Sequence, residues 1–193
     1  NSDCAGYGDF REITRRDDID AVLIGTPDHW HVLTALDAVR NGKDAYVEKP
    51  LAYSIHEGRV LSDAVASEKR ILQTGSQQRS DARFRQACEL VRNGRIGKVK
   101  YIEVGLGQGH TDYAETAGQT AFAPPPPELD YDRWLGPAPD APYCPARVHK
   151  NWRWIMAYGG GTVMDWVGHH LDIAHWAMGL DNSGPETVEG TGV

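Results

Sequence analysis

Three residues from two distant parts of the chain are of types that perform proton-transfer chemistry. Lys49 lies in a Glu-Lys-Pro triplet directly after a short apolar run, and Asp165 and His169 follow the run Gly159-Gly160-Gly161. A lysine supplies a cation that stabilises negative charge on oxygen, and a histidine exchanges a proton near neutral pH. Together these residue types indicate chemistry at an oxygen atom, provided that the fold brings them to one place.

The Asp165/His169 pair also has simpler interpretations. At 100° per residue, Asp165, His169, Asp172 and Trp176 fall within a sector of roughly 60° of a helix predicted over 162–178. The opposite face is apolar and holds Val163, Val167, Leu171, Ala174 and Met178. The polar face could simply be solvated, and an Asp and a His one turn apart also have metal-ligand spacing. Three glycines before the helix permit close approach of a ligand or another backbone, which favours a site.

The segment around Lys49 predicts three strands that alternate with helices. Short apolar runs over 20–24, 44–47 and 71–74 are typical of buried parallel strands. A helix is expected after Thr26 as N-cap and Pro27 as first helical residue, and a second after the Ser54-x-x-Glu57 capping box.

Right-handed crossovers place these strands side by side in one parallel sheet. The loops from Thr26 to His31, Glu48 to Pro50 and Gln77 to Arg79 then meet at its carboxyl edge, where open α/β sheets bind ligands.

The rest of the chain predicts a different architecture, beginning with a helix from Asp81 to about Arg92. Polar and apolar residues alternate over 97–105, as in a strand of a second sheet, and residues 187–193 are expected to form another strand. Residues 123–145 hold eight of the eleven prolines, which predicts an extended loop without regular structure. A domain boundary is therefore expected near Ser80.

Composition excludes several classes of partner. The net charge of −7 argues against binding to nucleic acid or to an anionic membrane surface, because both need a basic face. No apolar run approaches the ~20 residues that cross a bilayer. Cys4, Cys88 and Cys144 are odd in number and far apart, so neither a disulfide framework nor a Cys-x-x-Cys zinc site is expected. A reduced, cytoplasmic environment follows, with a leader upstream of Asn1 as the alternative.

The motifs resemble those of a known family, the Gfo/Idh/MocA oxidoreductases. The resemblance rests on the segment from Asp20 to His31, on Gly42 to Pro50, and on Gly159-Gly-Gly-x-x-x-Asp165-x-x-x-His169. It implies a Rossmann-like domain that binds NAD or NADP, followed by an α+β domain whose open, largely antiparallel sheet shapes a substrate pocket.

Residues 1–80 then correspond to the C-terminal half of the cofactor domain, and residues 81–193 to the first part of the substrate and oligomerisation domain. The family's Gly-x-Gly-x-x-Gly loop is not in this sequence, since Gly6-Tyr-Gly8 lacks the third glycine. We expect that loop upstream of Asn1, with both ends of the chain truncated, and a homo-oligomer for the full-length protein. The truncated chain itself could be inactive.

The resemblance also implies roles for individual residues. Lys49 would lie beside the nicotinamide and the reacting hydroxyl of a sugar or polyol, together with Asp165 and His169. Our hypothesis makes His169 the base, Asp165 its support and Lys49 the stabilising cation. Candidate cofactor contacts are Thr26, Pro27, His31, Glu48, Lys49, Gln77, Arg79 and Arg153, and no metal is expected.

Three functions are compatible with these residues. The first is a dehydrogenase with net reduction of NAD. The second is a redox-neutral glycosidase or lyase, in which a sugar carbon is oxidised transiently and then restored. The third is a non-catalytic module that senses a nucleotide or sugar, and a metal-dependent hydrolase is less favoured than any of these.

Overall fold

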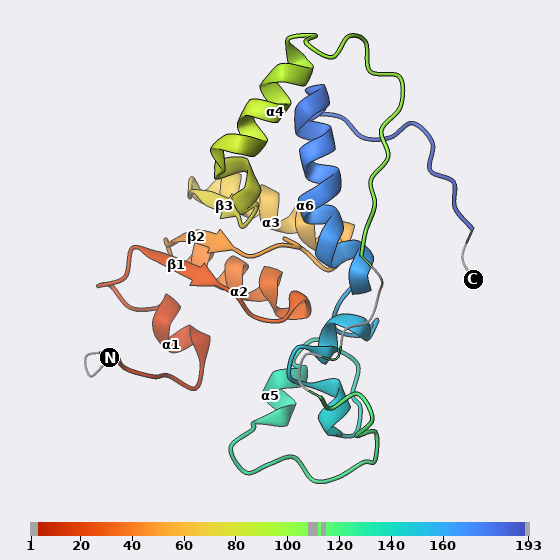
Figure 1. Cartoon of the computed structure of the whole chain (residues 1–193). Coiled ribbons are helices and arrows are strands. Elements are labelled where there is room, and N and C mark those ends of the chain that lie inside the picture. Colours follow the sequence, from red (N-terminus) through yellow and green to blue (C-terminus); the bar gives the residue numbers. More distant parts are fainter. Residues whose placement is uncertain (1–3, 108–111, 113–114, 192–193) are drawn as a thin grey trace. The chain divides into compact units, whose positions relative to one another are not determined.

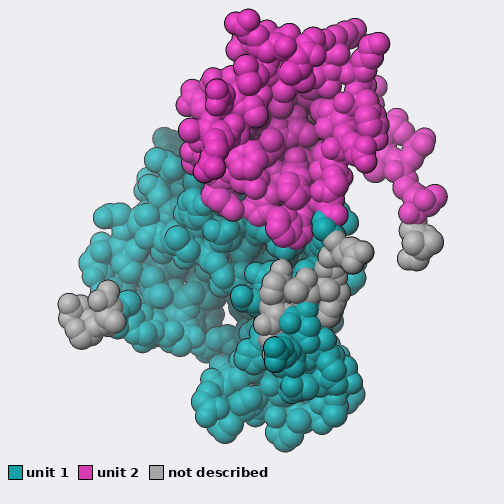
Figure 2. All heavy atoms as spheres, viewed as in Figure 1, with its two compact units in different colours: residues 1–75, 107–165 teal, residues 76–106, 166–193 magenta. Residues whose placement is uncertain are grey.

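The computed structural model describes residues 4–107, 112 and 115–191. The chain divides into two compact units. Unit 1 comprises residues 1–75 and 107–165, and unit 2 comprises residues 76–106 and 166–193 (Figure 2). No helix in the described part of the chain combines the length and the apolar character needed to cross a membrane.

Unit 1 is built on a parallel sheet of three strands (Figure 1). The strands are β1 (Ala21–Ile24), β2 (Asp44–Val47) and β3 (Leu72–Thr74), in the order β1-β2-β3. Ile24 pairs with Val47, and Val47 pairs with Thr74, so all three strands end at the same edge. The parallel sheet predicted from the sequence is confirmed.

Three helices belong to this part of unit 1, namely α1 (Phe10–Thr14), α2 (Asp28–Arg40) and α3 (Ile55–Glu68). α2 packs on both the sheet and α3, and their shared core consists of Ile24, Val32, Ala35, Leu36, Ala45, Val47 and Leu61. Burying each of the larger aliphatic side chains stabilises the fold by about 1.5–3 kcal/mol. The prediction of Thr26 as the N-cap of α2 was wrong by one residue. Pro27 occupies the N-cap position, and no side chain caps this helix.

The described residues of 107–165 form a second, mainly irregular part of unit 1 with an aromatic core. Its short helices are α5 (Tyr131–Leu135), η2 (Pro145–Arg147) and η3 (Asn151–Trp154). The expectation of no regular structure over 123–145 was therefore wrong at α5. The Asp130 side chain accepts a hydrogen bond from the Arg133 amide and starts this helix, while Tyr131 stacks on Trp134 with ring centroids 5.9 Å apart.

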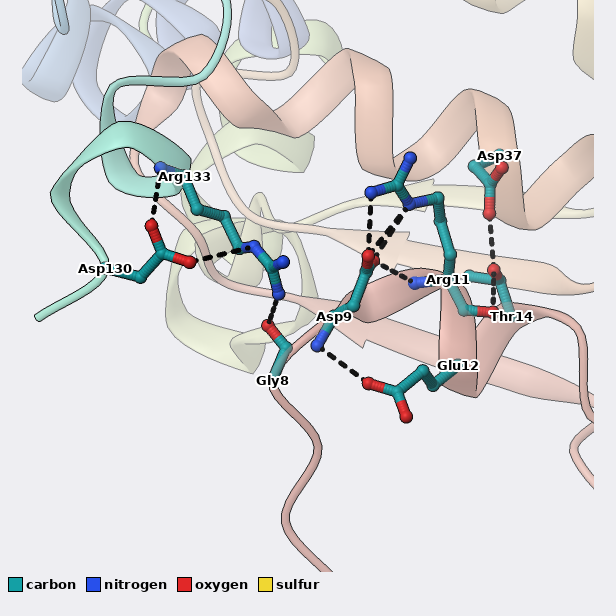
Figure 3. A network of polar contacts seen from close by, with 8 residues as sticks. All are labelled: Gly8, Asp9, Arg11, Glu12, Thr14, Asp37, Asp130 and Arg133. Carbon is teal, nitrogen blue, oxygen red and sulfur yellow. Dashed lines mark hydrogen bonds and ion pairs between the residues drawn. The ribbon is translucent and has the colours of Figure 1, made fainter. Parts of the chain in front are cut away.

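Polar contacts join α1 to the rest of unit 1 (Figure 3). Asp9 and Glu12 form a capping box at the start of α1, and the Thr14 hydroxyl donates to the Asp37 carboxylate of α2. The Arg133 guanidinium of α5 donates to the Gly8 carbonyl. Thr14 is buried, and its hydroxyl lies within hydrogen-bond distance of both the Asp37 carboxylate and the Arg11 carbonyl oxygen.

Thr14→Val is expected to lower the free energy of unfolding by about 1 kcal/mol, because it removes one buried hydrogen bond and keeps the side-chain shape. Urea unfolding of the two proteins measures the difference. Thr14→Ser, which keeps the hydroxyl, is the matched control and should lose less. A Val variant as stable as the natural protein would show that the Thr14–Asp37 contact contributes nothing.

Unit 2 consists of η1 (Gln77–Ser80), α4 (Ala82–Arg92) and the greater part of α6 (Gly161–Met178). Apolar side chains from α4, from α6 and from residues 96–105 line a groove. Residues 97–105 were expected to form a strand, but they contain no strand in the described structure, because a strand requires a hydrogen-bonded partner. Residues 187–191 likewise lack strand structure, and residues 192–193 of that expected strand lie outside the described residues. The antiparallel sheet stays a prediction.

The two faces of α6 differ from the simple amphipathic expectation. Val163 and Leu171, on the apolar face, are 62% and 40% exposed, whereas His169 is 8% exposed. The polar face carries ion pairs within unit 2, where Arg79 contacts Asp172. A freely solvated Asp/His face is therefore the wrong description of this helix.

Candidate active site

The ends of the three strands of unit 1 are tied together by backbone hydrogen bonds. The Glu48 amide donates to the Ile24 carbonyl at 2.9 Å, and the Gly75 amide donates to the Val47 carbonyl at 2.7 Å. Gly75 packs so closely against Glu48 that a Cβ atom built on it would lie 2.8 Å from Glu48 Oε2. The loop that carries Lys49 is thus held between the ends of β1 and β3.

His31 supports the same loop from α2. Its Nε2 lies 2.8 Å from the Thr26 carbonyl oxygen and its Nδ1 lies 2.7 Å from the Pro50 carbonyl oxygen. The ring is 1% exposed, and burial lowers the pKa of His31 although both carbonyls act in the opposite direction. Both ring nitrogens face backbone oxygens, so the His31 ring holds the two motif loops together, and its predicted role as a cofactor contact stays a prediction.

His31→Phe is expected to lower the free energy of unfolding by about 2 kcal/mol, because a ring is kept while the N–H of the neutral imidazole is lost and a part-buried carbonyl is left without its donor. Thermal unfolding measures the change. His56→Phe, at an exposed position on α3, is the matched control and should have little effect. Equal stability of the two variants would contradict a structural role for the His31 nitrogens.

Lys49 and Asp165 form an ion pair. The sequence motifs predicted that these two residues belong to one site. Lys49 Nζ lies 2.6 Å from Asp165 Oδ1 and donates to the Asp165 backbone oxygen at 2.7 Å. Both side chains are less than one-fifth exposed, and the Nε atom of Arg153 lies 4.0 Å from the same Oδ1. The carboxylate therefore orients a lysine ammonium at the carboxyl edge of the parallel sheet.

His169 and the η1 residues belong to unit 2. His169 follows Asp165 by one turn of α6, in the helix that the sequence predicted. Gln77 begins η1. The guanidinium of Arg79 contacts Asp172 at 2.7 Å and Asp181 at 2.8 Å, so it is already held by two carboxylates within its own unit.

Asp28 is a residue of the site that sequence reasoning missed. It is the first residue of α2, is 7% exposed, and accepts a hydrogen bond from the Gly160 amide. Burial raises the pKa of Asp28 to about 7, with Arg153 opposing the shift. The available sequence signal for Asp28 was its position in the segment that also carries Thr26, Pro27 and His31.

The residues at the sheet edge fit a bound dinucleotide. Thr26 Oγ1 is buried at the end of β1 and has no hydrogen-bond partner among the described residues, so a donor or acceptor of a ligand would satisfy it. Thr26, Pro27, Glu48 and Lys49 follow the carboxyl ends of β1 and β2, where open α/β sheets bind nucleotides. Among the described residues no group of three or more His, Cys, Asp or Glu could hold a metal ion.

The parallel sheet with its polar carboxyl edge defines the chain as part of a nucleotide-binding α/β protein. Comparison with known families is more specific. Residues 1–76 match the model of the GFO_IDH_MocA oxidoreductase family described as its NAD-binding Rossmann fold, and residues 80–192 match that family's C-terminal alpha/beta domain. The chain belongs to the Gfo/Idh/MocA oxidoreductase family, as its motifs predicted.

Individual relatives place the chain within this family. It is 37% identical over 92 residues to scyllo-inositol 2-dehydrogenase (NAD(+)) of Bacillus subtilis, covering 48% of this chain and 27% of that protein. It is 41% identical over 64 residues to an alpha-N-acetylgalactosaminidase of Shewanella oneidensis, covering 33% of this chain and 14% of that protein. An NAD-binding protein from Listeria innocua shares the fold, with a TM-score of 0.59 at 22% identity over 87% of this chain and 38% of its own. The chain thus spans less than two-fifths of each of these proteins.

Proposed function

We propose that the protein containing this chain is an NAD-dependent dehydrogenase that oxidises a hydroxyl-bearing carbon of a sugar or polyol. The observation that carries the proposal is the Lys49–Asp165 pair, held at the carboxyl edge of a parallel sheet. The family's NAD-binding Rossmann fold over residues 1–76 supports the cofactor. The match to scyllo-inositol 2-dehydrogenase supports a polyhydroxylated substrate.

Oxidation of an alcohol requires that hydride leave carbon while a proton leaves oxygen. Bound NAD supplies the hydride acceptor. In the proposed mechanism the Lys49 ammonium, oriented by Asp165, donates a hydrogen bond to the reacting oxygen and stabilises the negative charge that develops there. His169 takes the hydroxyl proton, because a neutral imidazole is an effective base near pH 7.

The remaining predicted cofactor contacts differ in the observations that support them. Thr26, Pro27 and Glu48 follow strand ends and are proposed to contact the cofactor. Arg153 lies near Asp165 and packs over the Trp152 ring at 4.4 Å, so we propose that it contacts either the substrate or a cofactor phosphate. Gln77 and Arg79 stay predictions. We further propose that the boundary in the sequence between the cofactor domain and the substrate domain lies near residue 80, between the two family-model matches.

A redox-neutral glycosidase is the second candidate. The specific observation in its favour is the match to the Shewanella alpha-N-acetylgalactosaminidase. In such an enzyme a sugar carbon would be oxidised with its hydride passing to NAD, which acidifies the neighbouring C–H bond. Loss of that proton would expel the aglycone, water would add in its place, and return of the hydride would reduce the carbon again. The same lysine, aspartate and histidine would serve both reactions.

The natural full-length protein should be incubated with NAD and, separately, with inositols, free sugars and aryl glycosides. Absorbance at 340 nm reports NADH, and released phenol reports glycoside cleavage. Sustained NADH production with an inositol or free sugar supports the dehydrogenase. NAD-dependent glycoside cleavage without accumulation of NADH supports the second candidate, and a protein that fails to bind NAD would contradict both.

A further inference from the structure

Asp28 lies where the start of α2 meets the glycine turn before α6, both within unit 1. Its carboxylate accepts the Gly160 amide, and a Cβ atom built on Gly159 would lie 3.2 Å from Asp28 Oδ2. The same Cβ would lie 3.2 Å from both the Cα and the carbonyl oxygen of Arg153. Glycine at position 159 therefore lets the turn pack directly on the Asp28 carboxyl and on the Arg153 backbone.

This environment is unusual for an acid in the first turn of a helix. Such acids commonly remain in water, where they interact favourably with the helix dipole. Asp28 is instead 7% exposed. The charged groups that act on it come from three separate segments, namely Arg153 in η3, Asp165 on α6 and Lys49 after β2. A buried carboxyl at the junction of these segments is well placed to set their spacing.

We propose that Asp28 is a positioning residue of the candidate site, which holds the Gly159–Gly160 turn so that Asp165 at the start of α6 reaches Lys49. This inference rests on the proposed function only for its catalytic consequence. Its structural content is a link from the first motif loop, through the Gly160 amide, to the Lys49–Asp165 pair. Asn at position 28 would keep an oxygen acceptor for Gly160, whereas Ala would remove it.

The first test measures the Lys49–Asp165 contact without relying on activity. Natural full-length protein, Asp28→Asn and Asp28→Ala are treated with acetic anhydride, and acetylation of Lys49 is quantified by mass spectrometry. Asp28→Ala is expected to raise the acetylation rate of Lys49 about tenfold, the factor that corresponds to losing one hydrogen bond to a charged group, while Asp28→Asn stays within about twofold of the natural protein. Exposed Lys69 is the internal control and should react equally in all three proteins.

The second test uses the charge of the carboxyl. Because the pKa of Asp28 is about 7 in the folded protein and about 3.9 in an unfolded chain, the folded state holds this proton more tightly. The stability from this group is therefore complete below about pH 4 and is lost as the pH rises through about 7. The melting temperature of the natural protein should fall relative to that of Asp28→Asn by about 3 °C between pH 5 and pH 8. Asp63→Asn, at an exposed position on α3, should show no such difference.

The outcomes separate this inference from the proposed function. Unchanged Lys49 acetylation in a folded Asp28→Ala protein would overturn the positioning role, and so would an Asn variant as reactive as the Ala variant. If the natural protein oxidises no polyol or sugar, the proposed function fails, yet the acetylation and melting experiments still decide the link. If it does, kcat should fall about tenfold in Asp28→Ala and recover in Asp28→Asn.

Discussion

Lys49→Ala is expected to lower kcat of the full-length enzyme by about 10²–10⁴-fold, with a much smaller change in KM. The reason is that the ammonium contributes mainly when charge develops on the substrate oxygen, so its loss affects the transition state more than the bound ground state. Initial rates of NADH formation over a range of polyol concentrations measure both constants. A decrease in kcat of less than threefold would contradict the proposed role of Lys49.

The variant should still fold, which makes its kinetics interpretable. Asp165 is partly solvated and keeps Arg153 as a neighbour at 4.0 Å, so removing Lys49 does not leave an isolated buried charge. Lys69→Ala, at an exposed position after α3, is the matched control and should retain full activity. Asp165→Asn should cause a smaller loss than Lys49→Ala, because the ammonium is then present but less firmly oriented.

Gly136→Ala is expected to have the largest effect on stability, lowering the free energy of unfolding by about 3–5 kcal/mol. Gly136 ends α5 with φ +51° and ψ −115°, a backbone conformation that residues with a side chain rarely adopt. A Cβ atom built there would also lie 2.1 Å from Cζ2 of Trp30, whose indole nitrogen donates to the Trp134 carbonyl at 3.1 Å. Backbone strain and overlap with the indole act at the same residue. Chemical denaturation measures the change.

Two further proteins separate these causes. Gly118→Ala is the control, since Gly118 is exposed with open space around its Cβ position, and it should change stability little. In a Trp30→Ala background the additional cost of Gly136→Ala should shrink, because the overlap is relieved and only the backbone strain remains. An undiminished cost in that background would show that Trp30 does not constrain Gly136.

Local patterns in the sequence were sufficient for much of the architecture. Apolar runs bounded by glycine predicted β1, β2 and β3, and the capping box at Ser54 is present in the structure at the start of α3. Both signals depend on residues within a few positions of one another. The strand over 97–105 illustrates the limit of such signals, because alternation favours a strand but only a partner strand can complete one.

The candidate site was predictable in part. Lys49 and Asp165 were chosen because their motifs resemble those of one family, and the structure places them in contact across 116 positions of sequence. Asp28 was overlooked although it lies in the first motif segment, because the Gly159 and Gly160 turn that covers it is distant in sequence. An acid after a proline at a helix start is ordinarily solvated, whereas tertiary contacts bury Asp28.

The sequence by itself determined the family, the parallel sheet and the placement of the first two motif loops at its carboxyl edge, because these follow from short-range periodicity and from motif order. Only the tertiary structure decided which polar groups remain available for a ligand. His31 is occupied by the Thr26 and Pro50 carbonyls, and Arg79 is occupied by Asp172 and Asp181, whereas the hydroxyl of Thr26 has no partner among the described residues. The physical reason is that a polar side chain binds the nearest available partner in space, and segments distant in sequence supply many of those partners.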